Sequence, residues 1–245
     1  MPQQKQLFFI LFGGTLLLLG SPLFVFFSGW QWQPYTEIPA FLYPLYLVTE
    51  TGTIPYALMT CVVFACIPLL YLKLPVKKIF LYLVIIVAYL AAGQIVKETM
   101  KNVYQEARPY VAWLETENII RSDDFYAMKR KERAVFMLEQ DFSKYSIPSW
   151  QQNHWSKETG YSFPSGHSMF AAQWLLLYLI LLWRKKAYLP IGLMCIWATG
   201  MEISRMVLGM HWAIDVFVSC LLAAILIYPV WWCYHRYRIA ESGSF

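Results

Sequence analysis

Charged residues are scarce in this sequence. Asp, Glu, Lys and Arg make up 14% of its 245 residues, whereas soluble domains contain about 25%. Apolar residues reach 58% and aromatic residues 18%, which excludes a disordered chain. With 12 glycines and five cysteines, the chain is neither collagen-like nor stapled by disulfides. The same composition argues against most soluble globular folds.

The cysteines lack the spacing of a disulfide or metal set. All five lie inside or at the edge of apolar runs, at Cys61, Cys66, Cys195, Cys220 and Cys233, and we interpret them as small packing residues. Asp, Glu and His do not show the spacing of a two-metal site either. The sequence therefore predicts neither a metal site nor a cofactor.

The charges that are present are unevenly distributed. Of the 35 charged residues, 20 lie between residues 97 and 161, and these are ten basic and ten acidic residues. The net charge of +5 therefore arises outside this segment and does not indicate a nucleic-acid partner. Long apolar runs with one charged segment between them are typical of a polytopic membrane protein with an extramembrane insert.

Six segments approach the roughly 20 apolar residues that a helix needs to cross a membrane. They are residues 7–27, 54–72, 79–96, 163–183, 187–208 and 212–233. The predicted fold class is therefore all-α, with six transmembrane helices. We expect residues 1–96 to hold the first three helices, residues 97–162 to form a helical periplasmic insert, and residues 163–245 to hold the last three helices.

The short loops predict the orientation, because cytoplasmic loops carry an excess of Lys and Arg. The loop at residues 29–53 has neither, and its only charges are Glu37 and Glu50. The opposite side collects Lys5, Lys73, Lys77, Lys78, Arg184, Lys185, Lys186, Arg236 and Arg238. We therefore expect both termini to be cytoplasmic and the insert to lie outside, on the periplasmic face if the cell has two membranes.

The insert has an amphipathic part at residues 123–144, where aromatic and aliphatic residues alternate with charges. This pattern predicts one or two short helices that lie on the membrane surface or over a site. A solvated helical hairpin fits the pattern equally well.

Polar residues beside membrane spans are costly and therefore point to function. Taken singly, the three polar clusters of this chain have plain explanations: bases at lipid head groups, a serine at a helix start, and a buried histidine with a carboxylate partner. The predicted topology brings all three to the same outer face. They are Lys101 with Arg108-Pro109, then Pro164-Ser165-Gly166-His167, and then Ser204-Arg205 through His211 to Asp215.

Together the clusters have the chemistry of a phosphate site. The guanidinium groups of Arg108 and Arg205 can hold phosphate oxygens in a bidentate fork, and Lys101 adds a point charge. The helix start offers free N–H groups, and Gly166 lets the backbone approach an anion closely. This set predicts a site for a phosphate monoester or diphosphate.

The histidines supply groups for a covalent step. His211 and Asp215 are four residues apart, so on a helix they share one face. The carboxylate can hold the Nδ1 proton and leave Nε2 free to attack phosphorus. His167 can then protonate the leaving oxygen and later activate water. We expect this chemistry to run without a metal.

The motifs K-x6-R-P, P-S-G-H and S-R-x5-H-x3-D, in this order, resemble the signature of the type-2 phosphatidic acid phosphatase superfamily. The K-E-T-G run at residues 157–160 extends the resemblance, which covers most of the chain. It implies that His211 is the nucleophile, that Asp215 orients it and that His167 is the general acid. It also implies that phosphate is bound by Lys101, Arg108, Ser165, Gly166 and Arg205.

The resemblance implies a membrane-embedded lipid phosphatase with phosphatidylglycerophosphate as the favoured substrate. Phosphatidic acid, lysophosphatidic acid, diacylglycerol pyrophosphate and undecaprenyl pyrophosphate are further substrates that fit, and no obligate protein partner is indicated. A dedicated undecaprenyl pyrophosphate phosphatase is the alternative within the enzyme class. A lipid-binding or lipid-flipping protein without hydrolysis and a vanadate-dependent haloperoxidase are more remote.

Three further polar residues have no catalytic role in this interpretation. Glu202 lies inside the fifth predicted span, where pairing with Arg205, a polar cavity and a packing role are all open, with packing favoured. His154 lies in the insert and His235 near the carboxyl terminus. His154 could line the mouth of the site, but we give neither histidine a role in the chemistry.

Overall fold

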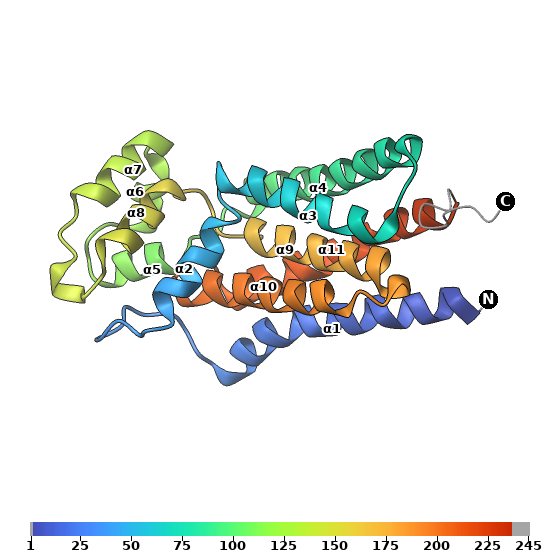
Figure 1. Ribbon diagram of the computed structural model, residues 1–245. Coiled ribbons are helices and arrows are strands. Elements are labelled where there is room, and N and C mark those ends of the chain that lie inside the picture. Colours follow the sequence, from blue (N-terminus) through green and yellow to red (C-terminus); the bar gives the residue numbers. More distant parts are fainter. Residues whose placement is uncertain (1, 237–245) are drawn as a thin grey trace.

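The structure, a computed structural model, describes residues 2–236, and the side chains of residues 2–4 and 235 are outside the described part. Arg238 and the side chain of His235 therefore lie outside it. All regular elements of the described chain are helices (Figure 1). They are α1 (Pro2–Ser28), α2 (Leu42–Glu50), α3 (Tyr56–Leu72), α4 (Val76–Tyr104), α5 (Pro109–Thr116), α6 (Ser122–Ala127), α7 (Arg130–Glu139), η1 (Ser143–Tyr145), α8 (Ser149–Lys157), α9 (Gly166–Leu182), η2 (Trp183–Lys185), α10 (Tyr188–Val207) and α11 (Ala213–Arg236).

Helix α9 is the centre of a bundle of long helices. It packs against α1, α3, α4, α10 and α11, and every residue from Ser168 to Leu182 is buried. A helix that is apolar all round can satisfy its surface only if it is enclosed on all sides. The hydrophobic sequence of α9 therefore explains its central place, and the other long helices form a layer around it.

The outer faces of this layer are strongly apolar. Large side chains such as Phe24, Leu58, Val87 and Ile196 are more than half exposed, and a soluble protein rarely leaves such a surface to water. Within residues 2–236, four segments are long and apolar enough to cross a membrane, namely Lys5–Ser28, Val76–Thr116, Gly166–Lys185 and Ala213–Tyr234. The chain is therefore a helical membrane protein.

The other two predicted spans are less clear by length and composition. Helix α3 is apolar but has only 17 residues, which span about 25 Å at 1.5 Å per residue. Helix α10 contains Glu202 and Arg205 and is not among the four segments. Both helices nevertheless pack in the bundle against α9. Six membrane crossings stay a prediction.

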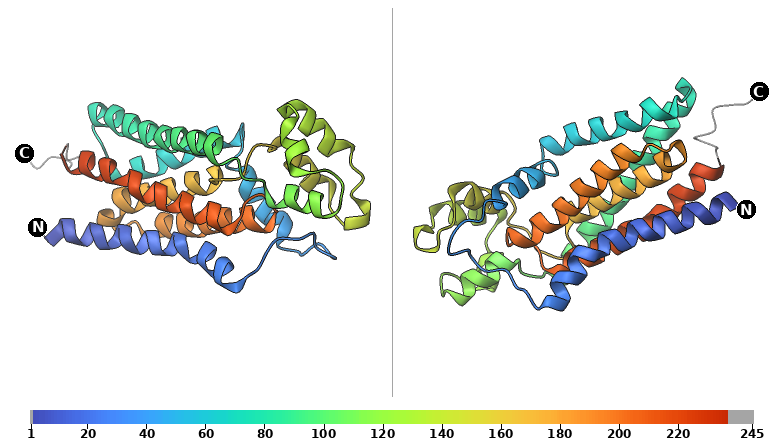
Figure 2. Two further views of the ribbon diagram at one scale, coloured as in Figure 1. Left: turned by 180° about the vertical axis from the view of Figure 1, so that it is seen from behind. Right: turned by 60° about the horizontal axis from the view of Figure 1, so that its bottom comes forward.

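The bundle has two different ends. Helix α1 begins and α11 finishes at one end, where the connections α3 to α4 and α9 to α10 also lie (Figures 1 and 2). The short helices α5 to α8 gather at the opposite end. The basic loop residues are thus at one end of the molecule and the insert at the other, as the charge pattern predicted for opposite sides of a membrane.

The insert has an aromatic core of its own. The rings of Tyr110 and Trp155 stack with centroids 5.0 Å apart. Trp32, from the connection between α1 and α2, packs edge-on against both Trp155 and Trp113. The indole Nε1 of Trp155 also donates a hydrogen bond to the carbonyl of Leu208 at 2.9 Å. This bond fastens α8 to the end of α10, next to the polar motifs.

The predicted amphipathic segment forms two short helices, α6 and α7, and the 3-10 turn η1. Three helices were not anticipated: α2, α5 and α8. Helix α4 runs on to Tyr104, so Lys97 and Lys101 lie on its last turns. All five cysteines are free thiols; Cys220 is buried, whereas Cys66 is exposed on the bundle.

Candidate active site

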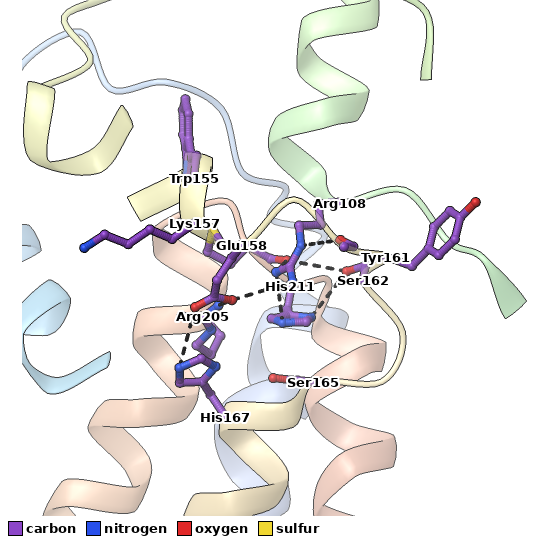
Figure 3. Close-up of polar contacts among 12 residues, drawn as sticks. Arg108, Trp155, Lys157, Glu158, Tyr161, Ser162, Ser165, His167, Arg205 and His211 are labelled. Atoms are coloured by element: carbon purple, nitrogen blue, oxygen red, sulfur yellow. Dashed lines mark hydrogen bonds and ion pairs between the residues drawn. The ribbon is translucent and has the colours of Figure 1, made fainter. Parts of the chain in front are cut away.

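The three polar motifs meet where the bundle joins the insert (Figure 3). Arg108 lies directly before α5, Ser165 caps α9, and Arg205 is in the last turn of α10. His211 lies in the turn between α10 and α11, and Asp215 is in the first turn of α11. The predicted convergence of three separate segments on one place is therefore present in the fold.

Asp215 orients the imidazole of His211 through a hydrogen bond at Nδ1. Nδ1 of His211 lies 3.2 Å from Oδ2 of Asp215, and the backbone N–H of Trp212 donates to the same oxygen at 2.9 Å. The hydroxyl of Ser162 also donates to this oxygen. Because a carboxylate only accepts hydrogen bonds, this arrangement places the imidazole proton on Nδ1.

The other nitrogen of His211 faces an arginine. Nε2 lies 3.2 Å from Nη1 of Arg108, and since a guanidinium can only donate, Nε2 must be the unprotonated nitrogen. Burial lowers the pKa of His211 well below its ordinary value, and the positive charges of Arg108 and Arg205 lower it further. His211 is therefore a neutral imidazole with its lone pair on Nε2, as a nucleophile requires.

The two arginines are held side by side and almost fully buried. Arg108 donates from Nε to the carbonyl of Gly160 at 2.8 Å and from Nη1 to that of Met210 at 2.9 Å. Arg205 donates from Nη1 to the hydroxyl of Thr49. Among the described residues, the buried Nε of Arg205 has no hydrogen-bond partner. An unpaired buried guanidinium donor is costly, so this N–H is available to an anion.

Glu158 from the insert lies between the basic groups (Figure 3). Its Oε2 accepts from Nη2 of Arg205 at 2.7 Å and lies 3.6 Å from Nη2 of Arg108. Its Oε1 lies 3.6 Å from Nε2 of His167. Burial alone would raise the pKa of Glu158, but the positive charge of Arg205 and its neighbours outweighs burial and holds the pKa well below its ordinary value. A carboxylate thus occupies the centre of the basic cluster.

His167 faces this centre from the first turn of α9. Its Nε2 lies 3.0 Å from the hydroxyl of Thr53, in the connection between α2 and α3. Gly52 packs so closely on the ring that an added Cβ would lie 2.6 Å from Cδ2 of His167. The backbone of this connection therefore fixes the ring opposite His211, with Glu158 on its open side.

The remaining predicted phosphate-binding residues have other partners in this state. The ammonium group of Lys101 donates to the carbonyls of Tyr161 and Ser162. The hydroxyl of Ser165 caps α9 and contacts that of Ser168 at 2.8 Å. Gly166 opens α9 beside Lys97, whose Cδ would lie 2.7 Å from an added Cβ.

Sequence reasoning missed Glu158, Glu50, Ser162 and Thr53. Glu158 lies four residues after His154, a spacing that places both on one face of a helix, and this was the available signal. Glu202 does not pair with Arg205; it accepts from Ser21 at 2.7 Å and from the thiol of Cys220 at 3.2 Å. Of its open interpretations, pairing with Arg205 was wrong.

Gly209 shapes the turn that carries His211. Its φ is +72°, and an added Cβ would lie 2.7 Å from atoms of the Trp32 ring. We expect Gly209→Ala to lower the free energy of unfolding by about 1–3 kcal/mol, measured by thermal unfolding of the detergent-purified protein. Gly20→Ala in α1 is the matched control, because its Cβ would meet nothing within 4 Å; equal losses in both variants would contradict the account.

The sequence profile of the PAP2 superfamily matches residues 82–239, a stretch that contains all three motifs. The chain therefore belongs to the PAP2 superfamily, and the resemblance predicted from the motifs is confirmed. It is similar to phosphatidylglycerophosphatase B of Escherichia coli (strain K12), with 41% identity over 223 residues that cover 91% of this chain and 87% of that protein. Phosphatidylglycerophosphatase B of Haemophilus influenzae is 38% identical over 218 residues, which cover 86% of this chain and 90% of that protein. These relationships place the chain among the lipid phosphatases, which are phosphoric monoester hydrolases.

Proposed function

We propose that this protein removes the terminal phosphate of phosphatidylglycerophosphate, and that it accepts other lipid phosphates and diphosphates in the same site. One observation carries this proposal: the guanidinium groups of Arg205 and Arg108 and the imidazole of His167 surround the carboxylate of Glu158, in the place that we assign to the phosphate. The orphaned Nε of Arg205 is one donor more than the carboxylate uses. A phosphate, with more oxygens than a carboxylate, makes use of such an extra donor.

In the first step, Nε2 of His211 attacks phosphorus and the bond to the lipid oxygen breaks. Asp215 accepts the hydrogen bond from Nδ1 and stabilises the positive charge that the imidazole gains. The guanidinium groups of Arg108 and Arg205 balance the charge on the equatorial phosphate oxygens. His167 gives its proton to the departing lipid oxygen. The products are a lipid alcohol, or a lipid monophosphate from a diphosphate, and a phosphohistidine.

In the second step, a water molecule attacks phosphorus from the side that the lipid has left. His167, now neutral, takes the proton of this water. The bond between Nε2 of His211 and phosphorus breaks, and inorganic phosphate leaves. All positive charge needed at the phosphate comes from Arg108, Arg205 and Lys101, so the proposed mechanism uses no metal.

Glu158 must give up its place for phosphate to bind. It uses the same guanidinium donors as a phosphate would, and two anions in one basic pocket repel each other. Glu158 lies in the loop directly after α8, which has no regular structure up to the start of α9. The loop backbone is held by hydrogen bonds from Arg108 to Gly160 and from Lys101 to Tyr161, so we expect the side chain of Glu158 to move when the substrate arrives.

The lipid attached to the phosphate is chosen outside the basic cluster. The names of the E. coli and H. influenzae relatives favour phosphatidylglycerophosphate, whereas a dedicated undecaprenyl pyrophosphate phosphatase would have the same cluster. We further propose that both termini are cytoplasmic and that the site faces the periplasm. The separation of the basic loops and the insert at opposite ends of the bundle supports this orientation under the positive-inside rule.

Phosphate release from a panel of lipid phosphates tests the proposed function. The purified protein, in detergent with EDTA throughout, is given each of the five lipids named above at equal surface concentration. We expect release from all of them, because each lipid ends in a phosphate that the same cluster can bind. We expect the highest kcat/KM for phosphatidylglycerophosphate, which the names of the relatives favour. A strong preference for undecaprenyl pyrophosphate would favour the dedicated enzyme. Binding without release would favour a lipid-binding protein, and activity restored only by a divalent metal would contradict the metal-free mechanism.

A further inference from the structure

A second row of hydrogen bonds through a histidine lies next to the site, and it runs from Glu50 through His154 to Arg205. Nδ1 of His154 lies 3.0 Å from Oε1 of Glu50, and Nε2 lies 3.1 Å from Nη1 of Arg205. His154 belongs to α8 and Glu50 is the last residue of α2. Since the guanidinium can only donate, Nε2 of His154 accepts, and the proton on Nδ1 faces the carboxylate. The order carboxylate, histidine, arginine is the same as in Asp215, His211 and Arg108.

The two rows of hydrogen bonds differ in whether a substrate has access to the histidine. His154 is completely buried, and the ring of Tyr46 packs edge-on against it with centroids 5.5 Å apart. It therefore has no free face for a substrate. Its hydrogen bond acts on the orientation of Arg205 instead, because Nη1 has only two acceptors in the described structure, Thr49 and His154.

We propose that His154 and Glu50 are positioning residues that hold the guanidinium of Arg205 in the orientation that phosphate binding requires. This inference rests on the proposed function, since it assigns Arg205 to the phosphate. Without the acceptor on His154, Arg205 keeps Thr49 and Glu158. Glu158, however, must leave when phosphate enters. The guanidinium would then be held on one edge by Thr49 alone, and a misplaced binding group weakens both binding and catalysis.

The row of hydrogen bonds from Glu50 through His154 to Arg205 also makes phosphate binding sensitive to acid. The charged groups that face His154 are Glu50 from α2, Arg205 from α10 and Glu158 after α8, and Lys157 lies 3.9 Å from Glu50. Burial lowers the pKa of His154, and of the charged neighbours the two carboxylates oppose this shift while Arg205 adds to it. When His154 gains a proton below this pKa, Nε2 carries an N–H that points at the guanidinium. The acceptor is lost, so KM for the lipid phosphate rises as the pH falls.

Substitutions at His154 test the proposal. We expect His154→Ala to raise KM for the lipid phosphate and Ki for inorganic phosphate about tenfold, with a smaller change in kcat. His154→Gln keeps an acceptor near the position of Nε2 and cannot be protonated, so we expect KM within about threefold of wild type and a weaker rise of KM at acidic pH. Asn153→Ala, at an exposed position of the same helix, is the matched control and leaves all three constants unchanged.

A double-mutant cycle separates positioning from general support of the fold. In an Arg205→Ala background, His154→Ala should cause no further loss of inorganic phosphate affinity, measured by isothermal titration calorimetry, because the group it positions is gone. An unchanged Ki in His154→Ala, or an equal loss in both backgrounds, would overturn the proposal. If His154→Ala does not fold, an unaltered acid dependence of KM in His154→Gln overturns it instead. Phosphate binding that depends on His154 in a protein that hydrolyses no lipid would contradict the proposed function and leave this inference standing.

Discussion

Replacement of His211 by alanine is expected to abolish phosphate release, with kcat lower by about 10⁴-fold or more. The reason is that Nε2 of His211 has a lone pair and a tautomer fixed by Asp215, whereas His154, which has the same arrangement with Glu50, is covered by Tyr46. No other residue replaces it as a nucleophile. The measurement is inorganic phosphate released from phosphatidylglycerophosphate by wild-type and variant proteins purified in the same detergent.

Asp215→Asn provides the graded comparison for this prediction. The amide still fills the space, but it can present an N–H to Nδ1 of His211 and so favour the wrong tautomer. We expect a loss of about 10²–10⁴-fold, smaller than that of His211→Ala. Both variants should keep the thermal transition of the wild type within a few degrees. Turnover near the wild-type rate in His211→Ala would mean that His211 is not the nucleophile.

Removal of Arg108 is also expected to have a large effect on the rate. Its guanidinium touches Nε2 of His211 and lies beside Glu158, so it lies next to the oxygens of a phosphate that His211 attacks. We expect Arg108→Ala to lower kcat by about 10²–10³-fold, which is typical for the loss of one donor that stabilises charge in the transition state. Arg108→Lys keeps the charge but loses the bidentate fork of the guanidinium, and its activity should lie between that of the wild type and that of Arg108→Ala.

Arg108→Ala should also alter the pH dependence of kcat/KM. Arg108 is one of the charges that lower the pKa of His211, so its loss raises this pKa towards the ordinary value. The neutral nucleophile then predominates only at higher pH, and the acidic limb of the kcat/KM profile moves to higher pH. Arg121→Ala is the matched control, since this arginine of the same insert is exposed and its guanidinium pairs with Asp123 at 3.3 Å. An equal effect of both substitutions would show that general charge, and not the position of Arg108, matters.

The sequence predicts the long helices well because their signal is local. Five of the six long apolar runs have a helix within three residues of the expected start, and α1 begins five residues before it. The motif residues Arg108, His167, Arg205 and His211 meet as expected. The end of α4 was missed because the hydrophobicity of the sequence falls at Lys97. Lys, Glu and Met nevertheless favour a helix, and α4 continues to Tyr104.

The missing parts of the site depend on packing between distant segments. Glu50 ends α2 and Thr53 follows it in the connection to α3, and both are more than 100 residues from their partners His154 and His167. A single polar residue carries no sign of such a partner. The short helices α2, α5 and α8 were missed for a related reason. Helices this short are not stable alone, and the aromatic core around Trp155 holds them in place.

The covalent intermediate at His211 is the most direct test of the whole account. The purified protein is mixed with phosphatidylglycerophosphate labelled in its terminal phosphate and quenched in alkali within milliseconds to seconds, because phosphohistidine survives alkali but not acid. The account predicts label that is stable to alkali and lost in acid, on the peptide that contains His211, with none in His211→Ala. Rapid lipid turnover with no label on this peptide at any time would contradict it.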